Sequence, residues 1–316
     1  MFDITWNITI GRGFKLLLLD SVTITRSVEQ LADTAEIVLP GSVFNKAIEI
    51  EKQIRRGDPV TIEAGYDGNN ITEFTGYLEA IATDDGSIKL KCEDGIFNFR
   101  KKIEDKEFTN PDVKDLLKYA CSQIGGYTLS CDYTFKYDKF VVRGYTGYDL
   151  LKKIQEECKA NVYLKDNVLH VHPQYKEIFG TAKYSFQQNI EKSDLEYRIA
   201  EDRPYEVTVE GKGKDGKVIR VVSGKKGGDS ETIKRDGISD IASLTSLAEE
   251  VGKHKSYTGY SGSITGWLVP YCDAGYKVSL KDEDYEYKDG DYYVLEVVTK
   301  LSKSGGERTI KIGAKI

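Results

Sequence analysis

The sequence predicts a mainly β protein in which two small, related β-barrels flank an α+β domain. Three observations predict this class. Short runs of alternating polar and apolar residues fill both ends of the chain, and the period changes to that of helices near residue 106. The composition, with 21 Tyr and 30 Gly among 316 residues, is typical of many strands joined by tight turns. We therefore expect a first β-barrel over residues 1–105, an α+β insert over 106–180 and a second β-barrel over 181–316.

The first part begins with the cleanest alternation in the chain. Apolar residues from Ile4 to Ile10 alternate with polar ones, as in a half-buried strand. Residues 42–55 carry apolar side chains at helical spacing and predict a helix between strands. Five or six short strands predict a small barrel, because a barrel closes its own edges. Further strands are expected at 22–25, 35–39, 60–64, 74–81 and 88–92.

Helix signals mark the middle part. Thr109-Asn110-Pro111 predicts the N-cap and first residue of a helix that ends at Gly125-Gly126. Thr146, with Asp149 three residues later, predicts a capping box at the start of a second helix. Asp166-Asn167 predicts the turn of a hairpin. Two helices and a hairpin predict a compact α+β unit.

The third part returns to strand patterns, interrupted by one helix that Ser239 or Asp240 caps. Its strands echo those of the first part. Gly57–Glu63 aligns with Gly275–Lys281, and Gly76–Ile81 aligns with Tyr293–Val298. The shared order predicts two copies of one barrel, so three chains would present six similar barrels. Since antiparallel meanders resemble one another at this level, two unrelated barrels are the alternative.

Charge and composition argue against several classes of protein. The formal net charge of −6 argues against binding nucleic acid or anionic lipid through bulk charge. The acidic excess lies in residues 1–105, with 12 basic and 18 acidic residues, and we hypothesise that it lines a channel for DNA. The apolar run Leu16–Leu19 is too short for a signal peptide or a spanning helix, which predicts no export signal and no membrane anchor.

Five widely spaced cysteines predict reduced, buried thiols in a protein made in a cytoplasm, since no pair has metal-site or redox spacing. They are Cys92, Cys121, Cys131, Cys158 and Cys272.

Two glycine-rich or basic patterns resemble ligand sites. Gly211, Gly213 and Gly216 have the spacing of a dinucleotide-binding loop. A strand pattern follows them, whereas phosphate binding needs a helix N-terminus there, so we predict a hairpin loop. Residues 212–235 hold eight basic residues but no aromatic side chain for base stacking. We predict a solvated or partner-docking loop, with transient contact to exiting DNA as the alternative.

Two further patterns resemble metal sites. His170 and His172 place two imidazoles on one strand face, which can begin such a site. Cys158 is the only plausible further ligand nearby in the sequence, so we predict a polar strand face. The acidic residues from Asp282 to Asp291 lack the Gly and Glu that an EF-hand needs at positions 6 and 12, so we predict a turn. With three His and no nucleophile motif, we predict no catalytic residue, no cofactor and no metal ligand.

Short motifs follow one another along most of the chain, most weakly over residues 173–235. They are Asp33–Pro40, Gly57–Val60, Phe74–Leu78, Cys92–Gly95, Gly144–Leu151, Glu157–Ala160, Asn167–Val171, Gly259–Trp267 and Gly305–Gly313. In this order they resemble the tail-hub proteins of phages and contractile injection systems, the late control gene D protein group.

The resemblance implies a structural protein rather than an enzyme. It implies a homotrimer whose barrels form a pseudo-sixfold ring that joins the hexameric tail tube above to the trimeric central spike below. It further implies contacts with other baseplate proteins and a place in the virion tail or injection-system baseplate, assembled in the cytoplasm of the bacterial host. The chain ends at Ile316, directly after the second predicted barrel, so we expect the spike and any wall-degrading domain to be separate chains.

Two other functions stay open from the residues alone. One is a Tyr-rich β module that binds a glycan or a host receptor, which predicts aromatic side chains clustered on one exposed face. The other, less favoured, is a cell-wall hydrolase with a pair of carboxylates, because Asp and Glu are plentiful.

Overall fold

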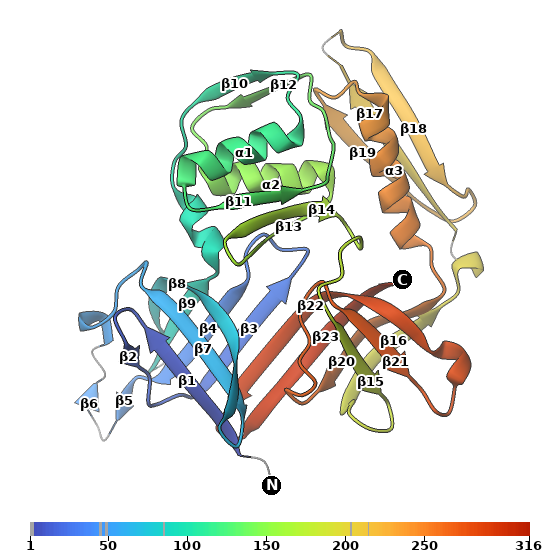
Figure 1. Ribbon diagram of the computed structural model, residues 1–316. Helices are drawn as coiled ribbons and strands as arrows, with labels where there is room; N and C mark the ends of the chain where they lie inside the picture. Colours follow the sequence, from blue (N-terminus) through green and yellow to red (C-terminus); the bar gives the residue numbers. More distant parts are fainter. Residues whose placement is uncertain (1–2, 44–45, 48–49, 85, 203, 214) are drawn as a thin grey trace.

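A sheet of thirteen strands runs through both ends of the chain, and an α+β unit lies above the place where its two arms meet (Figure 1). The computed structural model describes residues 3–43, 46–47, 50–84, 86–202, 204–213 and 215–316. The predicted mainly β class is confirmed. None of the sheets formed by these described residues closes on itself, so the two β halves are open and joined rather than two closed barrels.

The first half of the large sheet is an antiparallel meander. Its strands are β1 (Ile4–Ile10), β2 (Phe14–Lys15), β3 (Ser21–Ser27), β4 (Thr34–Pro40), β7 (Pro59–Tyr66), β8 (Asn69–Asp84) and β9 (Ser87–Glu93). In space the order is β3, β4, β9, β8, β7, β1, β2. In β3, β4 and β9 every second residue is buried, as the alternation predicts, and Ile8, Ile24 and Ile37 are each 0% exposed in one core.

The helix predicted over residues 42–55 is wrong for the described part of that segment. β5 (Ser42–Val43) pairs with β6 (Lys46–Ala47), and the 3-10 turn η1 (Ile50–Lys52) follows. Residues 44–45 and 48–49 lie outside the described residues. The apolar residues at helical spacing correspond to a single helical turn in the described residues, in which the Ile54 amide donates to the Ile50 carbonyl at 3.2 Å.

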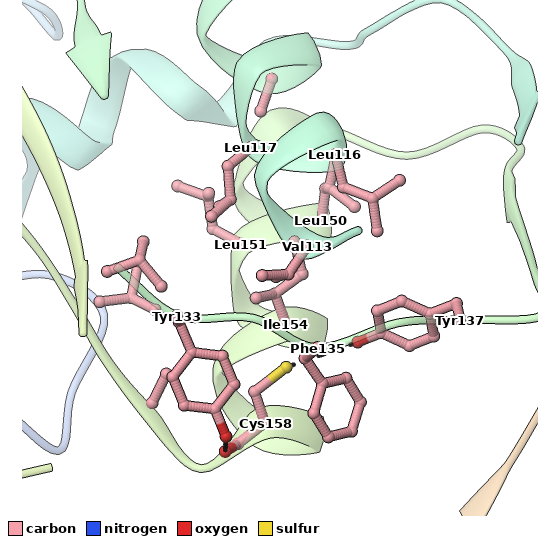
Figure 2. Packing of buried hydrophobic residues seen from close by; sticks show 14 of the residues in the cluster. Val113, Leu116, Leu117, Tyr133, Phe135, Tyr137, Leu150, Leu151, Ile154 and Cys158 are labelled. Atoms are coloured by element: carbon pink, nitrogen blue, oxygen red, sulfur yellow. Dashed lines mark hydrogen bonds between the residues drawn. The ribbon is translucent and has the colours of Figure 1, made fainter. Parts of the chain in front are cut away.

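The α+β unit packs two helices on each other and on a small sheet. Its elements are η2 (Gly95–Arg100), β10 (Lys106–Thr109), α1 (Val113–Ile124), β11 (Thr128–Cys131), β12 (Lys139–Val142), α2 (Gly147–Cys158), β13 (Ala160–Lys165) and β14 (Val168–Pro173). Figure 2 shows the apolar stripes of α1 and α2 facing each other, with Cys158 among the aromatic rings below. The hairpin between β13 and β14 turns at Asp166 and Asn167, both with positive φ, as predicted.

The helix starts follow the capping rules, with one difference. At α2, Thr146 and Asp149 form the predicted capping box. At α1 the capping box is formed by Asp112 and Asp115, so the predicted start at Thr109 to Pro111 is wrong. Asn110 has a φ of 51°, which the first turn of a helix cannot adopt, and the chain therefore enters the helix only after it.

The second half of the large sheet repeats the order of the first. Its strands are β15 (Thr181–Ser185), β16 (Lys192–Arg198), β20 (Gly259–Gly266), β21 (Lys277–Lys281), β22 (Gly290–Ser302) and β23 (Gly305–Lys315), with the turn η4 (Glu286–Lys288). The order β21, β22, β23, β20, β16 corresponds to β7, β8, β9, β4, β3. Both copies also carry a bulge in the corresponding strand, at Glu79 in β8 and at Leu295 in β22, one position apart in the alignment of Gly76–Ile81 with Tyr293–Val298. This shared irregularity supports the internal repeat.

Residues 205–255, which lie within the unit expected over 181–316, pack chiefly against the α+β unit and make a smaller contact with β23. They form β17 (Tyr205–Lys212), β18 (Val218–Gly224), β19 (Asp229–Asp236) and α3 (Ile241–Lys255), preceded by η3 (Ala200–Asp202). The apolar faces of this layer join the core of the α+β unit, and the Asp138 amide donates to the Gly237 carbonyl at 2.9 Å. Strand periodicity shows that one face is buried, but not what it packs against.

Candidate functional site: the buried junction between the two halves

The two halves of the large sheet meet where β3 pairs with β22. The antiparallel register runs from Ser21 opposite Ser302 to Ser27 opposite Glu296. β22 also pairs with β21 and β23, so one strand belongs to the second half and is hydrogen-bonded to the first. A continuous backbone ladder therefore fixes the two halves relative to each other.

A bulge in β8 turns a carboxylate into this junction. Thr72 lies opposite Glu63 and Phe74 opposite Ile62, so Glu73 has no partner on β7. A bulge of this kind re-aims a side chain. The Glu73 side chain is 0% exposed and points into the molecule.

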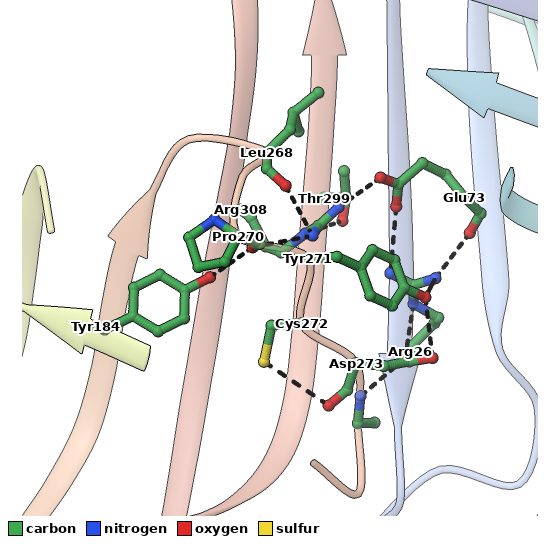
Figure 3. A network of polar contacts seen from close by, with 11 residues as sticks. Arg26, Glu73, Tyr184, Leu268, Pro270, Tyr271, Cys272, Asp273, Thr299 and Arg308 are labelled. Carbon is green, nitrogen blue, oxygen red and sulfur yellow. Dashed lines mark hydrogen bonds and ion pairs between the residues drawn. The ribbon is translucent and has the colours of Figure 1, made fainter. Parts of the chain in front are cut away.

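Two arginines from different halves share the Glu73 carboxylate (Figure 3). Arg308 on β23 forms an ion pair with Oε1, and Nη2 of Arg26 on β3 lies 3.3 Å from Oε2. Arg308 also donates to the Leu268 carbonyl at 3.0 Å, and both guanidinium groups lie against the ring of Tyr271, with Cζ 4.8 and 5.4 Å from its centroid. Each charge in the cluster has a partner, which a buried charge requires.

Three further carboxyl groups, those of Asp273, Asp33 and Asp94, lie next to this cluster. Asp273 Oδ1 lies 3.0 Å from Arg26 Nε and Asp273 accepts a hydrogen bond from the Tyr271 hydroxyl at 3.2 Å. Burial raises the pKa of Asp33 to about 7, the Asp273 charge adds to the shift, and Arg26 opposes it. Burial and the neighbouring Asp33 also raise the pKa of Asp94 well above its usual value.

Raised carboxyl pKa values also occur in enzymes, but the space here argues for a structural role. Asp33 and Asp273 line a cavity of about 100 Å³. Sites for small ligands are usually at least about 300 Å³. The carboxyl groups contact Arg26, Tyr271 and a backbone amide, and the Arg26–Asp273 ion pair joins a strand of the first half to the second half.

The glycine motif and the basic stretch belong to the α3 layer. Gly211 to Gly216 span the end of β17 and the turn toward β18, which pair antiparallel, so the motif is the predicted hairpin loop. Residues 229–236, which we predicted as part of a basic loop, form strand β19 instead. Arg235 donates to the carbonyl oxygens of Glu156 and Glu157 at 3.0 and 2.6 Å, at the end of α2, where a cation is favourable. Lys214 lies outside the described residues.

The acidic run near the end of the chain is the predicted turn. Asp289 pairs with Lys281 at 2.8 Å and accepts from the Asp282 amide at 2.8 Å, while Asp291 pairs with Lys277 at 2.8 Å. These contacts occupy the carboxylates with lysines and a backbone amide. The lysine contacts also lower the pKa of Asp289 and Asp291.

The histidine pair has neighbours that the sequence did not suggest. Cys158, the one further ligand that the sequence made plausible, lies elsewhere, with its thiol 3.7 Å from the Tyr137 hydroxyl. In the described part of the chain, Glu177 joins His170 and His172 in a group whose ligand atoms all lie within 4.8 Å of one another. Glu177 is in the segment after β14, whose position in the fold no strand or helix pattern predicts. The only hint in the sequence was a carboxylate shortly after the His-x-His strand.

The cysteines and tyrosines are mostly interior residues. All five cysteines are free and four are buried, and burial raises the pKa of Cys92 and Cys272 to about 12. Of the 21 tyrosines, only Tyr285 and Tyr287 are exposed, so the tyrosines do not form the broad exposed face that a Tyr-rich glycan-binding module predicts. Among the described residues, no helix is long and apolar enough to span a membrane.

No protein-family model matches the chain, and no curated protein matches its sequence. Solved structures do match over nearly its whole length. A tail protein from Neisseria meningitidis has 17% identity and a TM-score of 0.66, covering 98% of this chain and 96% of that one. The 43 kDa tail protein of prophage MuSo2 from Shewanella oneidensis has 15% identity and a TM-score of 0.67, covering 99% and 98%.

A third match comes from a secretion system. It is an E. coli component of the type VI secretion system, described as structurally similar to the T4 bacteriophage tail proteins gp27 and gp5. The identity is 6% and the TM-score 0.60, with 98% of this chain and 76% of that one covered. The chain therefore has the fold of these phage tail proteins and of this type VI secretion component.

Proposed function

We propose that this protein is a structural hub of a tail or baseplate, in which three copies form a pseudo-sixfold ring between a hexameric tube and a trimeric spike. The observation that carries the proposal is the repeated strand order, with its shared bulge at Glu79 and Leu295. Identical chains associate in closed rings, so a chain with two similar units offers six of them per trimer. The structural similarity to phage tail proteins supports a position of this ring in a tail.

A ring of this kind needs two units held at a fixed angle within each chain. The β3–β22 ladder and the buried cluster around Glu73 supply that rigidity, since both join the first half to the second. If the halves moved freely, three chains would not present six evenly spaced units to the tube. The ionic junction is thus a positioning device in the proposed hub.

We assign the polar face of the large sheet to the channel. On each strand, the residues that alternate with the core are half-exposed and mostly polar, as at Thr23, Glu36 and Glu63 in the first half and Ser263 and Thr309 in the second. Acidic side chains on this face repel phosphate groups, so DNA passes without binding. Glu36→Lys together with Glu63→Lys should slow DNA passage, whereas unchanged infectivity of normally assembled particles would contradict this assignment.

The oligomeric state tests the proposal. Light scattering on the purified chain, alone and co-expressed with the products of neighbouring genes, should give a ring with three copies of the 35.5 kDa chain. A monomer that clears suspensions of bacterial cell walls would instead support the hydrolase alternative. Binding of the isolated monomer to a glycan array would support the receptor-binding alternative.

A further inference from the structure

Three ligand-type side chains meet where the chain leaves the α+β unit. His170 and His172 lie on β14, and Glu177 comes from the segment that leads to β15. Tyr175 has a φ of 65° and turns this segment back over the histidines. Its ring stacks on His254 of α3 with centroids 3.8 Å apart, so the turn is fixed by packing rather than left to the segment itself.

The three ligand atoms have the separations of a zinc site. His172 Nε2 lies 3.4 Å from His170 Nδ1 and 3.1 Å from Glu177 Oε2, and His170 Nδ1 lies 4.0 Å from Glu177 Oε2. Zinc–ligand bonds of about 2.0–2.2 Å in tetrahedral geometry place neighbouring ligand atoms about 3.3–3.5 Å apart. The separation between the two histidine nitrogens lies within this range. The Glu177 oxygen is slightly too near His172 and too far from His170, and a small torsion of its partly exposed side chain corrects both distances.

The carboxylates around His172 favour a positive charge at this position. Its side chain is 3% exposed, yet a carboxylate oxygen faces each ring nitrogen, Asp132 Oδ1 at 2.7 Å from Nδ1 and Glu177 Oε2 at 3.1 Å from Nε2. A neutral imidazole carries one N–H and can donate to only one of them. If Nδ1–H donates to Asp132, the Nε2 lone pair faces the Glu177 carboxylate, which has only lone pairs, while His170 Nδ1 lies 3.4 Å away and donates or accepts according to its tautomer.

The second layer of contacts matches that of known metal sites. Histidine ligands almost always donate their other ring N–H to a carboxylate, as His172 can to Asp132. Asp132 is itself held by an ion pair with Lys176, and the Tyr163 hydroxyl donates to Glu177 Oε2 at 3.3 Å. The Tyr163 ring also stacks on His170 with an interplanar angle of 4°, which fixes the imidazole plane.

We propose that His170, His172 and Glu177 bind one Zn²⁺, with Asp132 as a positioning residue and a water molecule as the fourth ligand. Two imidazole nitrogens and a carboxylate oxygen in a tetrahedral arrangement suit this ion. The metal ties β14 to the segment that enters β15, and so fastens the α+β unit to the second half of the sheet. This inference does not depend on the hub role.

The test measures zinc on the full chain, purified without a polyhistidine tag. After removal of metal with a chelator and dialysis against ZnCl₂, we expect one zinc per chain by elemental analysis. Glu177→Gln and His170→Gln should each abolish stoichiometric binding, while Glu283→Gln, a change at an exposed carboxylate outside the cluster, should retain it. Asp132→Asn should weaken zinc binding about 10–100-fold, as expected for a residue that orients a ligand.

Cobalt gives a second readout. Co²⁺ in place of Zn²⁺ should show the visible absorption of a tetrahedral ion in the wild type and in Glu283→Gln, but not in Glu177→Gln. The proposal is overturned if the wild type retains no zinc or if Glu177→Gln retains as much. It is equally overturned if nitrogen NMR finds protons on both ring nitrogens of His172 in zinc-treated chain at neutral pH, because the imidazole is then a buried cation between two carboxylates.

Discussion

The Glu73 carboxylate and the Arg308 guanidinium form an ion pair in which both side chains are 0% exposed. They are 235 positions apart in the sequence and belong to the two different halves of the large sheet. Because both groups are removed from water, each depends on the other for its stabilisation. The loss of stability when one partner is removed therefore measures how much this ion pair contributes to joining the two halves.

Removal of one partner should be costly. We expect Arg308→Met to lower the free energy of unfolding by about 3–5 kcal/mol, because it leaves Glu73 with less compensation in the interior. The matched control is Lys311→Met on the same strand, whose partner Glu29 is 3.0 Å away and about as exposed as the lysine. That change should cost less than about 1 kcal/mol. Calorimetry of both variants checks the prediction, and equal losses would contradict it.

The raised pKa of Asp33 predicts a pH dependence of stability. The folded chain holds the Asp33 proton up to a pKa of about 7, whereas the unfolded chain releases it near its ordinary value of about 3.9. The contribution of this group to stability is thus fully present below about pH 4 and is lost as the pH rises to about 7. Asp33→Asn removes that loss. The difference in melting temperature between the variant and the wild type should therefore shift in favour of the variant as the pH rises from 5 to 8.

Asp289, whose pKa is lowered rather than raised, provides the control. Lys281 lowers the pKa of Asp289, so its contribution is lost only as the pH falls below the ordinary aspartate range. Asp289→Asn should therefore leave the melting curve parallel to that of the wild type between pH 5 and pH 8. A parallel curve for Asp33→Asn as well would show that Asp33 is ionised throughout this range in the folded chain.

The two capping boxes predict where the helices of the α+β unit are sensitive. Thr146→Ala and Asp112→Ala should each lower the free energy of unfolding by about 1 kcal/mol, because each leaves backbone amides at a helix start without an acceptor. Thr109→Ala, at the start that the sequence alone favoured, should change it by less than about 0.5 kcal/mol. Denaturant unfolding of the three variants separates the two helix starts.

The buried thiols predict slow chemical labelling. Burial raises the pKa of Cys121 to about 11 and that of Cys92 to about 12, so little thiolate is present at pH 8. The native chain should react with a thiol reagent first at the half-buried Cys131, and all five cysteines should react in denaturant. Mass spectrometry of the labelled peptides identifies the order, and early labelling of Cys92 would contradict the packing of the first half.

Local rules in the sequence predicted much of the fold. The capping box at Thr146, the hairpin turn at Asp166-Asn167 and the alternation in β1 depend on neighbouring residues, and all three are confirmed. The matching segments of the two β regions also predicted the shared strand order. Closure of each barrel was expected from the need to cover sheet edges, but the pairing of β3 with β22 instead covers one edge of each half.

Features that depend on distant contacts could not be predicted in the same way. The bulge at Glu73 and its pairing with Arg308 follow from the register of strands far apart in the sequence. The packing of residues 205–255 on the α+β unit depends on which apolar face they meet. Glu177 and Asp132 reach the histidine pair only because a turn at Tyr175 and the end of β11 bring them there.

In the proposed hub, three chains form the ring at the tail tip. Cryo-electron microscopy of tail or baseplate particles that contain this protein tests it most directly. We predict three copies around the axis, whose six β halves form one pseudo-sixfold layer between tube and spike. Any other copy number in that layer, or particles whose tip assembles fully without this protein, would contradict the account.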